Sequence, residues 1–218
     1  MGHRRKPALV TDIKVESPVL NLTYPKVSGL KHKSAESSIN RYIKKEVNGL
    51  LKEEGCGVDG DKKFTGGYTV KLNKRGTLCI VIEVYCHKKG EEKGITFRKY
   101  INVSLKDARV YYLEDLFSRK IKKSKFIDAI NEFVKGNLVS KGIKSEAFDS
   151  IAINQDYYLS ENSLVLCFER SEFNFVDNGF EEFEIPFEDI EDIINTKGPI
   201  GRLLRNKDDN INEETADE

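Results

Sequence analysis

The sequence lacks any long apolar run. None of its segments approaches the roughly 20 consecutive apolar residues that a membrane-spanning helix needs. The basic start, residues 1–6, resembles the first part of a signal peptide, but Asp12, Lys14 and Glu16 interrupt the apolar stretch that would have to follow it. As written, the sequence therefore predicts a soluble, cytoplasmic protein with no membrane insertion. An excised ectodomain would instead be extracellular.

An excess of one charge sign is also absent. The 218 residues include 36 Lys and Arg and 36 Asp and Glu, which gives a formal net charge of zero. A protein that binds nucleic acid normally carries a basic excess or a basic stripe. We therefore expect no nucleic-acid partner. The length suits one large domain or two small interlocked domains.

Cysteine and histidine are scarce. The four cysteines form no CxxC pair, and they are interpreted as reduced, apolar thiols, although four cysteines allow three disulfide pairings: Cys56, Cys79, Cys86 and Cys167. The three histidines, His3, His32 and His87, lie in unrelated segments. A zinc site needs about four convergent ligands. The sequence thus predicts no metal site and no cofactor.

Motifs of well-known enzyme classes are missing as well. The sequence has no GxSxG elbow, no HExxH motif and no glycine-rich phosphate loop. Carboxylates are plentiful, for example Glu181, Glu182 and Glu184, and acid–base catalysis by such a pair stays open. No catalytic residue is assigned, and an enzyme is the minority interpretation.

Residues 8–110 have the pattern of an N-terminal α+β subdomain. Residues 8–30 alternate as one strand at a sheet edge, with Pro18 near its start and Pro25 near its end. Ser34 then offers a helix N-cap, and apolar residues recur at spacings of three and four as far as Leu51. Residues 64–73, 77–87 and 95–105 follow as a three-stranded meander whose last strand has one polar face.

Residues 111–195 predict a second α+β subdomain. An amphipathic helix runs from Phe126 to Leu138, and strands are expected at 156–160, 163–169 and 180–185, before a short helix at 187–195. Residues 196–218 are interpreted as a disordered acidic tail. The elements do not alternate as βαβ units, so the predicted class is α+β, with antiparallel sheets, two main amphipathic helices and a short C-terminal helix.

Aromatic side chains indicate a candidate binding surface. Two tyrosines flank a charged loop at 90–94, two more lie at a strand end, and the loop-like stretch 171–183 is rich in phenylalanine. Aromatic rings anchor many interfaces, and tyrosine adds a hydroxyl. The candidate binding residues are Tyr85, Tyr100, Tyr157, Tyr158, Phe173, Phe175 and Phe180. For the tyrosines, the alternative is that they cap the core, whereas the phenylalanines of 171–183 are expected to be exposed.

Four stretches occur in an order that resembles a known family. They are SPVLNLTYPKVSGL (17–30), YYLEDLF (111–117), NQDYYLSENSLVLCFER (154–170) and FEEFEIPFEDI (180–190). Over about residues 13–195, they resemble the two-part module in the extracellular region of RsiV-like anti-sigma factors. A similar module occurs beside the catalytic domain of some peptidoglycan deacetylases from Gram-positive bacteria.

This resemblance implies recognition of a partner and supplies no catalytic residue. In RsiV-like anti-sigma factors the module recognises lysozyme, which exposes the protein to cleavage and frees a sigma factor. Beside the deacetylases it is a non-catalytic accessory. The resemblance therefore implies that the partner is lysozyme or another protein, or peptidoglycan fragments. The rival hypotheses are a carboxylate-based glycan hydrolase and an intracellular structural or oligomerising protein.

The sequence departs from the family in two ways. Where family members commonly show a loop like GAAHG, residues 90–94 read Gly-Glu-Glu-Lys-Gly, with lysine in place of the histidine. Both glycines remain, so we expect a hairpin turn, with a ligand grip as a further hypothesis. The sequence also shows no membrane helix, export signal or sigma-binding arm, which is expected of a stand-alone relative or of an excised ectodomain.

Overall fold

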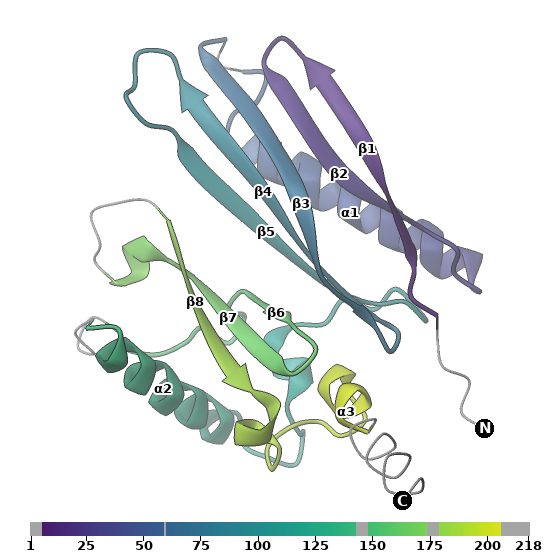
Figure 1. Cartoon of the computed structure of the whole chain (residues 1–218), viewed down its shortest axis with the longest axis vertical. Helices are drawn as coiled ribbons and strands as arrows, with labels where there is room; N and C mark the ends of the chain where they lie inside the picture. Colours follow the sequence, from purple (N-terminus) through teal and green to yellow (C-terminus); the bar gives the residue numbers. More distant parts are fainter. Residues whose placement is uncertain (1–5, 59, 143–147, 174–178, 206–218) are drawn as a thin grey trace, which may run out of the picture. The chain divides into compact units, whose positions relative to one another are not determined.

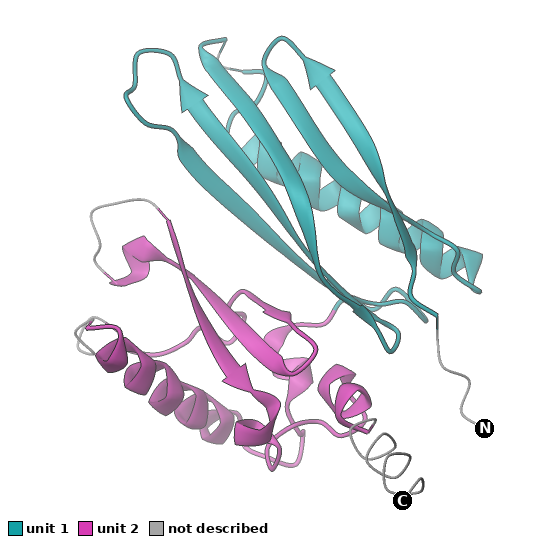
Figure 2. Cartoon of the chain, in the orientation of Figure 1, with its two compact units in different colours: residues 1–110 teal, residues 111–218 magenta. Residues whose placement is uncertain are grey.

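The computed structural model describes residues 6–58, 60–142, 148–173 and 179–205. The chain forms two compact units, residues 1–110 and 111–218, which are shown in different colours in Figure 2. About 30% of the described residues are helical and 39% lie in strands, divided between two sheets. The predicted α+β class is confirmed. Among the described residues, no helix is both long enough and apolar enough to cross a membrane.

The first unit is a five-stranded sheet with a long helix, α1 (Lys33–Glu53), across one face (Figure 1). The strands follow chain order: β1 (Leu9–Ser17), β2 (Leu20–Ser28), β3 (Lys62–Lys74), β4 (Thr77–Lys88) and β5 (Ile95–Ser104). All neighbours pair antiparallel except β2 and β3, which pair parallel over three residues, since α1 intervenes between them. The predicted meander is confirmed, with strand ends within two residues of those expected.

The core of this unit lies between α1 and the sheet. The helix buries one stripe at helical spacing, formed by Ala35, Ile39, Ile43, Val47 and Leu50. This stripe belongs to the same core as alternate residues of β4: Leu78, Ile80, Ile82, Val84 and Cys86. Removal of this apolar surface from water is the main favourable term that fixes the helix to the sheet.

The helix start differs from the prediction. It begins at Lys33, one residue before the expected cap Ser34, and the N-cap residue, His32, makes no side-chain hydrogen bond. Glu36 takes over the role of anchoring the entry to the helix. Its carboxylate accepts a hydrogen bond from the backbone N–H of Leu30 at 3.0 Å and pairs with Lys33 at 3.0 Å. These contacts hold the pKa of Glu36 below its usual value, the hydrogen bond from Lys33 being the largest cause.

The single edge strand expected at 8–30 is instead a hairpin. Strands β1 and β2 pair over their full length, and the chain reverses at Pro18. The Ser17 hydroxyl accepts the N–H of Leu20 at 3.1 Å, which closes the turn. The edge strand is therefore β1, while Pro25 lies in β2 beyond the three residues that pair with β3.

Two asparagines extend the hydrogen bonding of this sheet. The side chain of Asn40, on α1, accepts the N–H of Val27 at 2.8 Å and donates to its carbonyl at 2.8 Å. Asn73, on β3, binds the N–H and carbonyl of Ala8 in the same way, at 2.9 and 2.8 Å. Each side-chain amide thus binds one backbone N–H and one backbone carbonyl in a segment that does not pair with β3.

The second unit packs helix α2 (Lys123–Ser140) on a three-stranded antiparallel sheet of β6 (Tyr157–Leu159), β7 (Ser163–Glu169) and β8 (Phe180–Pro186), as Figure 1 shows. The helix buries Phe126, Ile130, Val134 and Leu138. Short 3₁₀ helices complete the unit: η1 (Leu113–Leu116), η3 (Arg170–Phe173) and η4 (Phe187–Ile190). The helix and strands expected here are confirmed, although β6 is shorter than predicted.

The C-terminal part differs from the prediction. The helix expected at 187–195 is only the short η4, after which Ile194 pairs with Phe117 in an isolated antiparallel bridge. Residues 199–204, expected to belong to the disordered tail, form helix α3 (Pro199–Leu204). Its Ile200 is fully buried, so apolar burial stabilises this turn despite the polar surroundings in the sequence. Residues 206–218 of the expected tail lie outside the described residues.

Candidate functional site: the hairpin between strands β4 and β5

The charged loop predicted at 90–94 joins β4 to β5, and two side chains of β4 hold it. The hydroxyl of Tyr85 accepts the N–H of Gly94 at 3.0 Å. The Nε2 atom of His87 lies 3.0 Å from the carbonyl oxygen of Glu91. The two rings stack, with centroids 6.5 Å apart and planes 26° apart. His87 therefore supports the loop backbone rather than a metal or a catalytic partner.

The two glycines of the loop have different reasons to be there. Gly90 has a φ of 91°, a left-handed conformation that side chains disfavour. Gly94 is needed for space, because an added Cβ would lie 2.3 Å from the carbonyl oxygen of Cys86 and 2.5 Å from the Tyr85 ring. The expectation that this stretch forms a hairpin turn is confirmed by the pairing of Cys86 with Ile95. The backbone at Gly94 therefore packs directly against the Tyr85 ring.

Tyr85 remains accessible although it anchors the loop. Its exposed fraction is 40%, and the neighbouring Ile95 is exposed to 41%. Tyr100 lies elsewhere, in the middle of β5 opposite Val81, and does not flank the loop as expected. The cross-strand pair Glu83 and Arg98 lies between the pairs that contain Tyr85 and Tyr100, and it forms an ion pair at 2.8 Å. The outer face of β4 and β5 therefore presents a tyrosine, then an ion pair, then a second tyrosine.

The tyrosines predicted at the other strand end are buried. Tyr157 is 3% exposed, and its hydroxyl donates to the carbonyl of Tyr111 at 2.9 Å. Tyr158 is 8% exposed and donates to Oε2 of Glu182 at 2.9 Å. Burial, and then this hydrogen bond, raise the pKa of Tyr158. Neither ring offers a face to solvent, so the exposed platform expected at this pair is not formed.

The phenylalanines of the 171–183 stretch are also mostly internal. Phe173 is 4% exposed and belongs to an aromatic cluster whose ring centroids lie 5.2 to 6.1 Å apart: Phe148, Phe168, Phe173 and Phe183. Phe180 is half-buried at the start of β8, and Phe175 lies outside the described residues. Edge-to-face rings of this kind stabilise a core. The expectation that the phenylalanines of this stretch are exposed is therefore wrong for Phe173, because its ring is part of the core.

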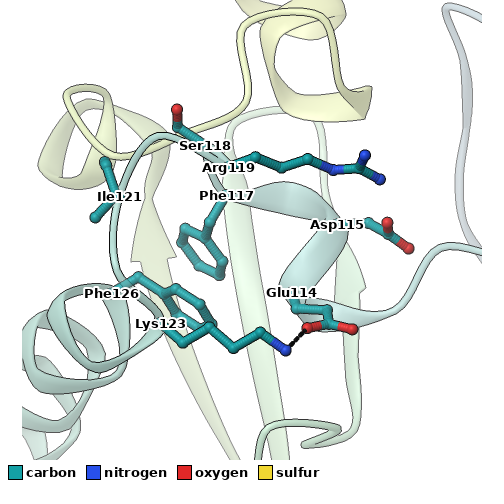
Figure 3. A pocket seen from close by; sticks show the side chains of 8 residues that line it. All are labelled: Glu114, Asp115, Phe117, Ser118, Arg119, Ile121, Lys123 and Phe126. Carbon is teal, nitrogen blue, oxygen red and sulfur yellow. Dashed lines mark ion pairs between the residues drawn. The ribbon is translucent and has the colours of Figure 1, made fainter.

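A pocket that the sequence reasoning missed lies between η1 and the start of α2. It has a volume of about 290 Å³ and is lined by Glu114, Asp115, Phe117, Ser118, Arg119, Ile121, Lys123 and Phe126 (Figure 3). The rings of Phe117 and Phe126 stack at 4.4 Å with planes 7° apart. The two carboxylates have structural partners, since Glu114 pairs with Lys123 and Asp115 accepts the N–H of Tyr112. The pocket thus combines an apolar floor with a charged rim.

Among the described residues, no group of three or more His, Cys, Asp or Glu side chains is arranged to hold a metal ion. The four cysteines are free thiols. Burial raises the pKa of Cys86 and of Cys56, which leaves both thiols mainly protonated at neutral pH.

The balanced whole-chain charge conceals a strong asymmetry between the units. Residues 1–110 contain 23 Lys and Arg against 12 Asp and Glu, a net charge of +11. Residues 111–218 contain 13 against 24, a net charge of −11. Counting charge by halves of the sequence would have found this signal. The two units are therefore expected to attract partners of opposite charge.

Comparison with known proteins informs only the fold. No family model matches the sequence, and no curated protein matches it. A member of the DUF3298 family from Bacteroides fragilis superposes with a TM-score of 0.64 at 14% identity, covering 92% of this chain and 98% of that one. A DUF3298 family protein from Pseudomonas aeruginosa PAO1 gives 0.62 at 12% identity, covering 90% and 94%.

The fold is similar to that of the DUF3298 proteins. The likeness extends over nearly the whole of both compared chains, so it includes both units rather than one common motif. The DUF3298 fold family is one of unknown function. The similarity therefore establishes the architecture and leaves the activity to be argued from the site.

Proposed function

We propose that this chain is a non-catalytic recognition module, related to the lysozyme-sensing ectodomain of RsiV-like anti-sigma factors, which binds a protein or a cell-wall glycan. The observation that carries the proposal is the likeness to DUF3298 structures along almost the entire chain. RsiV ectodomains contain DUF3298 domains. The similarity in fold thus supports, at the level of architecture, the resemblance to RsiV-like proteins that the four sequence stretches indicate.

The β4–β5 hairpin is the proposed contact surface. A recognition element needs accessible apolar groups on a rigid support, because ordering a loose loop on binding lowers the affinity. Tyr85 supplies the accessible ring on the outer face of β4 and β5. The hydrogen bond from Gly94 to Tyr85 and the contact of His87 with the Glu91 carbonyl supply the rigidity.

The charged loop residues then set the choice of partner. Glu91, Glu92 and Lys93 are all exposed and occupy the loop positions between the two glycines. Rim charges of this kind change the rate of association and the selection of partners more than the final affinity. The lysine in place of the family's histidine is therefore expected to alter partner selectivity while the loop geometry persists.

Three variants test this assignment by calorimetric titration of a c-type lysozyme and of soluble peptidoglycan fragments. Tyr85→Ala removes the ring and is expected to weaken binding about tenfold or more, as loss of a central aromatic anchor does. Tyr85→Phe keeps the ring, loses the hydrogen bond from Gly94, and should weaken binding less. Tyr112→Ala, which removes a tyrosine that is 59% exposed on the second unit, is the matched control and should bind like the unmodified chain.

Two results would contradict the proposal. Equal binding by the Tyr85→Ala and control variants would remove the hairpin from the contact surface. Release of shortened glycans from peptidoglycan fragments, detected by mass spectrometry and dependent on the chain, would contradict the non-catalytic assignment and favour a carboxylate-based hydrolase.

A further inference from the structure

A dense basic cluster lies in the otherwise acidic second unit. Five of the 13 basic residues of this unit fall within seven positions, and all five are exposed: Arg119, Lys120, Lys122, Lys123 and Lys125. The unit as a whole carries 24 acidic residues. Because five positive charges are concentrated here while the unit as a whole is negative, this surface has a local positive electrostatic potential.

The cluster is poorly neutralised by its own surroundings. Within the part of the chain that the structure describes, Lys123 is the only one of the five with a carboxylate partner, Glu114. The first turn of α2 contains no acidic residue, and its N-cap residue, Lys122, makes no side-chain cap. The positive end of the 18-residue helix therefore adds to the lysines instead of being compensated.

Two residues of this cluster, Arg119 and Lys123, line the pocket described above. Figure 3 shows the rings of Phe117 and Phe126 between Arg119 and the Glu114–Lys123 ion pair. Its volume of about 290 Å³ is at the lower end for small-molecule sites, so it suits one apolar side chain rather than a large cofactor. The stacked rings lie at the floor of the pocket, and its rim holds Arg119 beside the Glu114–Lys123 ion pair. The exposed Lys120, Lys122 and Lys125 follow close by in the sequence and supply the positive charge for carboxylates of a partner.

We propose that residues 117–126 form a binding surface for an acidic peptide segment of a partner protein, in which carboxylates contact the basic rim and one apolar side chain enters the pocket. A simple polyanion would use the lysines and leave the pocket unused. The combination of both features favours a peptide that carries acidic residues on each side of an apolar one. This surface lies in the second unit, whereas the β4–β5 hairpin lies in the first, so its test is independent of the proposed function.

The probe is a fluorescein-labelled, end-capped peptide Glu-Glu-Ile-Glu-Glu, titrated into the full chain and followed by anisotropy. A second full-length protein has Asp208, Asp209, Glu213 and Glu214 changed to Asn or Gln, which lowers the negative charge of the C-terminal sequence. We expect saturable binding to this second protein, and equal or weaker binding to the unmodified one. Replacing the peptide's Ile with Ser should lower the affinity about tenfold or more, since the burial of an apolar side chain would be lost.

Two charge-matched triple variants locate the surface. Combined Lys120→Gln, Lys122→Gln and Lys125→Gln should weaken binding about tenfold, because three exposed ion pairs with the peptide, each modest by itself, would be lost together. The control, Lys31→Gln, Lys44→Gln and Lys45→Gln, removes the same charge from exposed lysines of the first unit and should have no effect.

Each alternative result overturns the proposal. The absence of saturable binding to either protein rules out the surface. Equal loss of affinity in both triple variants assigns binding to overall charge. Equal affinity for the Ile and Ser peptides, together with full competition by inorganic polyphosphate, assigns the cluster to polyanions instead of an acidic peptide.

Discussion

The side chain of Asn40 offers the sharpest test of how the first unit is stabilised. Strand β2 pairs with β3 only at Leu20, Asn21 and Leu22, so the later part of β2 has no strand partner on that side. Asn40 makes two hydrogen bonds of 2.8 Å with the main chain of Val27, which is fully buried. Asn40→Ala removes both and leaves a buried donor and a buried acceptor without this partner.

The expected cost follows from these two groups. A buried polar group that loses its partner costs about 1–3 kcal/mol, whereas Ala at a helix position is favoured over Asn by roughly 0.5 kcal/mol. The net destabilisation of the Asn40→Ala variant, summed over the two groups, should therefore be about 1.5–5.5 kcal/mol. Asn40→Asp keeps the acceptor but sets a carboxylate oxygen against the Val27 carbonyl, and it should not restore the stability. Ser38→Ala, at an exposed position of the same helix, is the control.

The assay combines urea unfolding of the full chain, followed by far-ultraviolet circular dichroism, with hydrogen exchange of the Val27 amide. The variant should show a lower midpoint and a faster exchange of this amide, because the Asn40 side chain closes it off in the folded state. A change within about 0.5 kcal/mol of the Ser38→Ala control would refute the reasoning, since water would then satisfy Val27 equally well.

Three further predictions concern the hairpin and the edge strand. Replacing residues 91–93 with Ala should change the unfolding free energy by less than about 0.5 kcal/mol, because their side chains are exposed and the loop contacts use backbone atoms; a large fall in melting temperature would contradict this. Gly94→Ala should destabilise the chain by several degrees in melting temperature, since its Cβ would meet the Cys86 carbonyl, and a normal melting temperature would disprove the close fit. Burial and a 2.7 Å hydrogen bond to Asp12 raise the pKa of Tyr68 to about 12. The folded state therefore keeps this proton where the unfolded chain loses it, so the contribution to stability is complete below pH 10 and is lost as the pH rises through 12. Ultraviolet titration should show that Asp12→Asn moves this ionisation to lower pH, and an unchanged curve would refute the role of Asp12.

The parts of the fold that sequence reasoning predicted are those with regular apolar spacing. The α1 stripe repeats at helical spacing, and the three strands of the meander are rich in β-branched and aromatic residues, so local pattern and global packing agree. The β1–β2 hairpin was missed because β1 is largely exposed and has no clear apolar alternation. Pro18 was assigned to the start of a strand, whereas it lies in the turn.

The candidate site was predictable only where its contacts are local. Tyr85, His87 and Gly94 are within nine residues of one another, and their hairpin followed from the turn residues. The burial of Tyr157 and Tyr158 depends on acceptors 46 and 24 positions away, on Tyr111 and Glu182, and no local pattern indicates such pairs. The pocket at Phe117 also requires η1 and α2 to be packed together first.

The most direct test of the central claim is calorimetric titration of the full chain with a c-type lysozyme, with soluble peptidoglycan fragments titrated in parallel. The proposed recognition function predicts saturable heat with at least one of them and a loss of that heat in the Tyr85→Ala variant. Saturable binding of lysozyme would assign the chain to lysozyme sensing, and binding of the fragments alone would assign it to the accessory role. The absence of saturable heat with both would contradict the proposed recognition function.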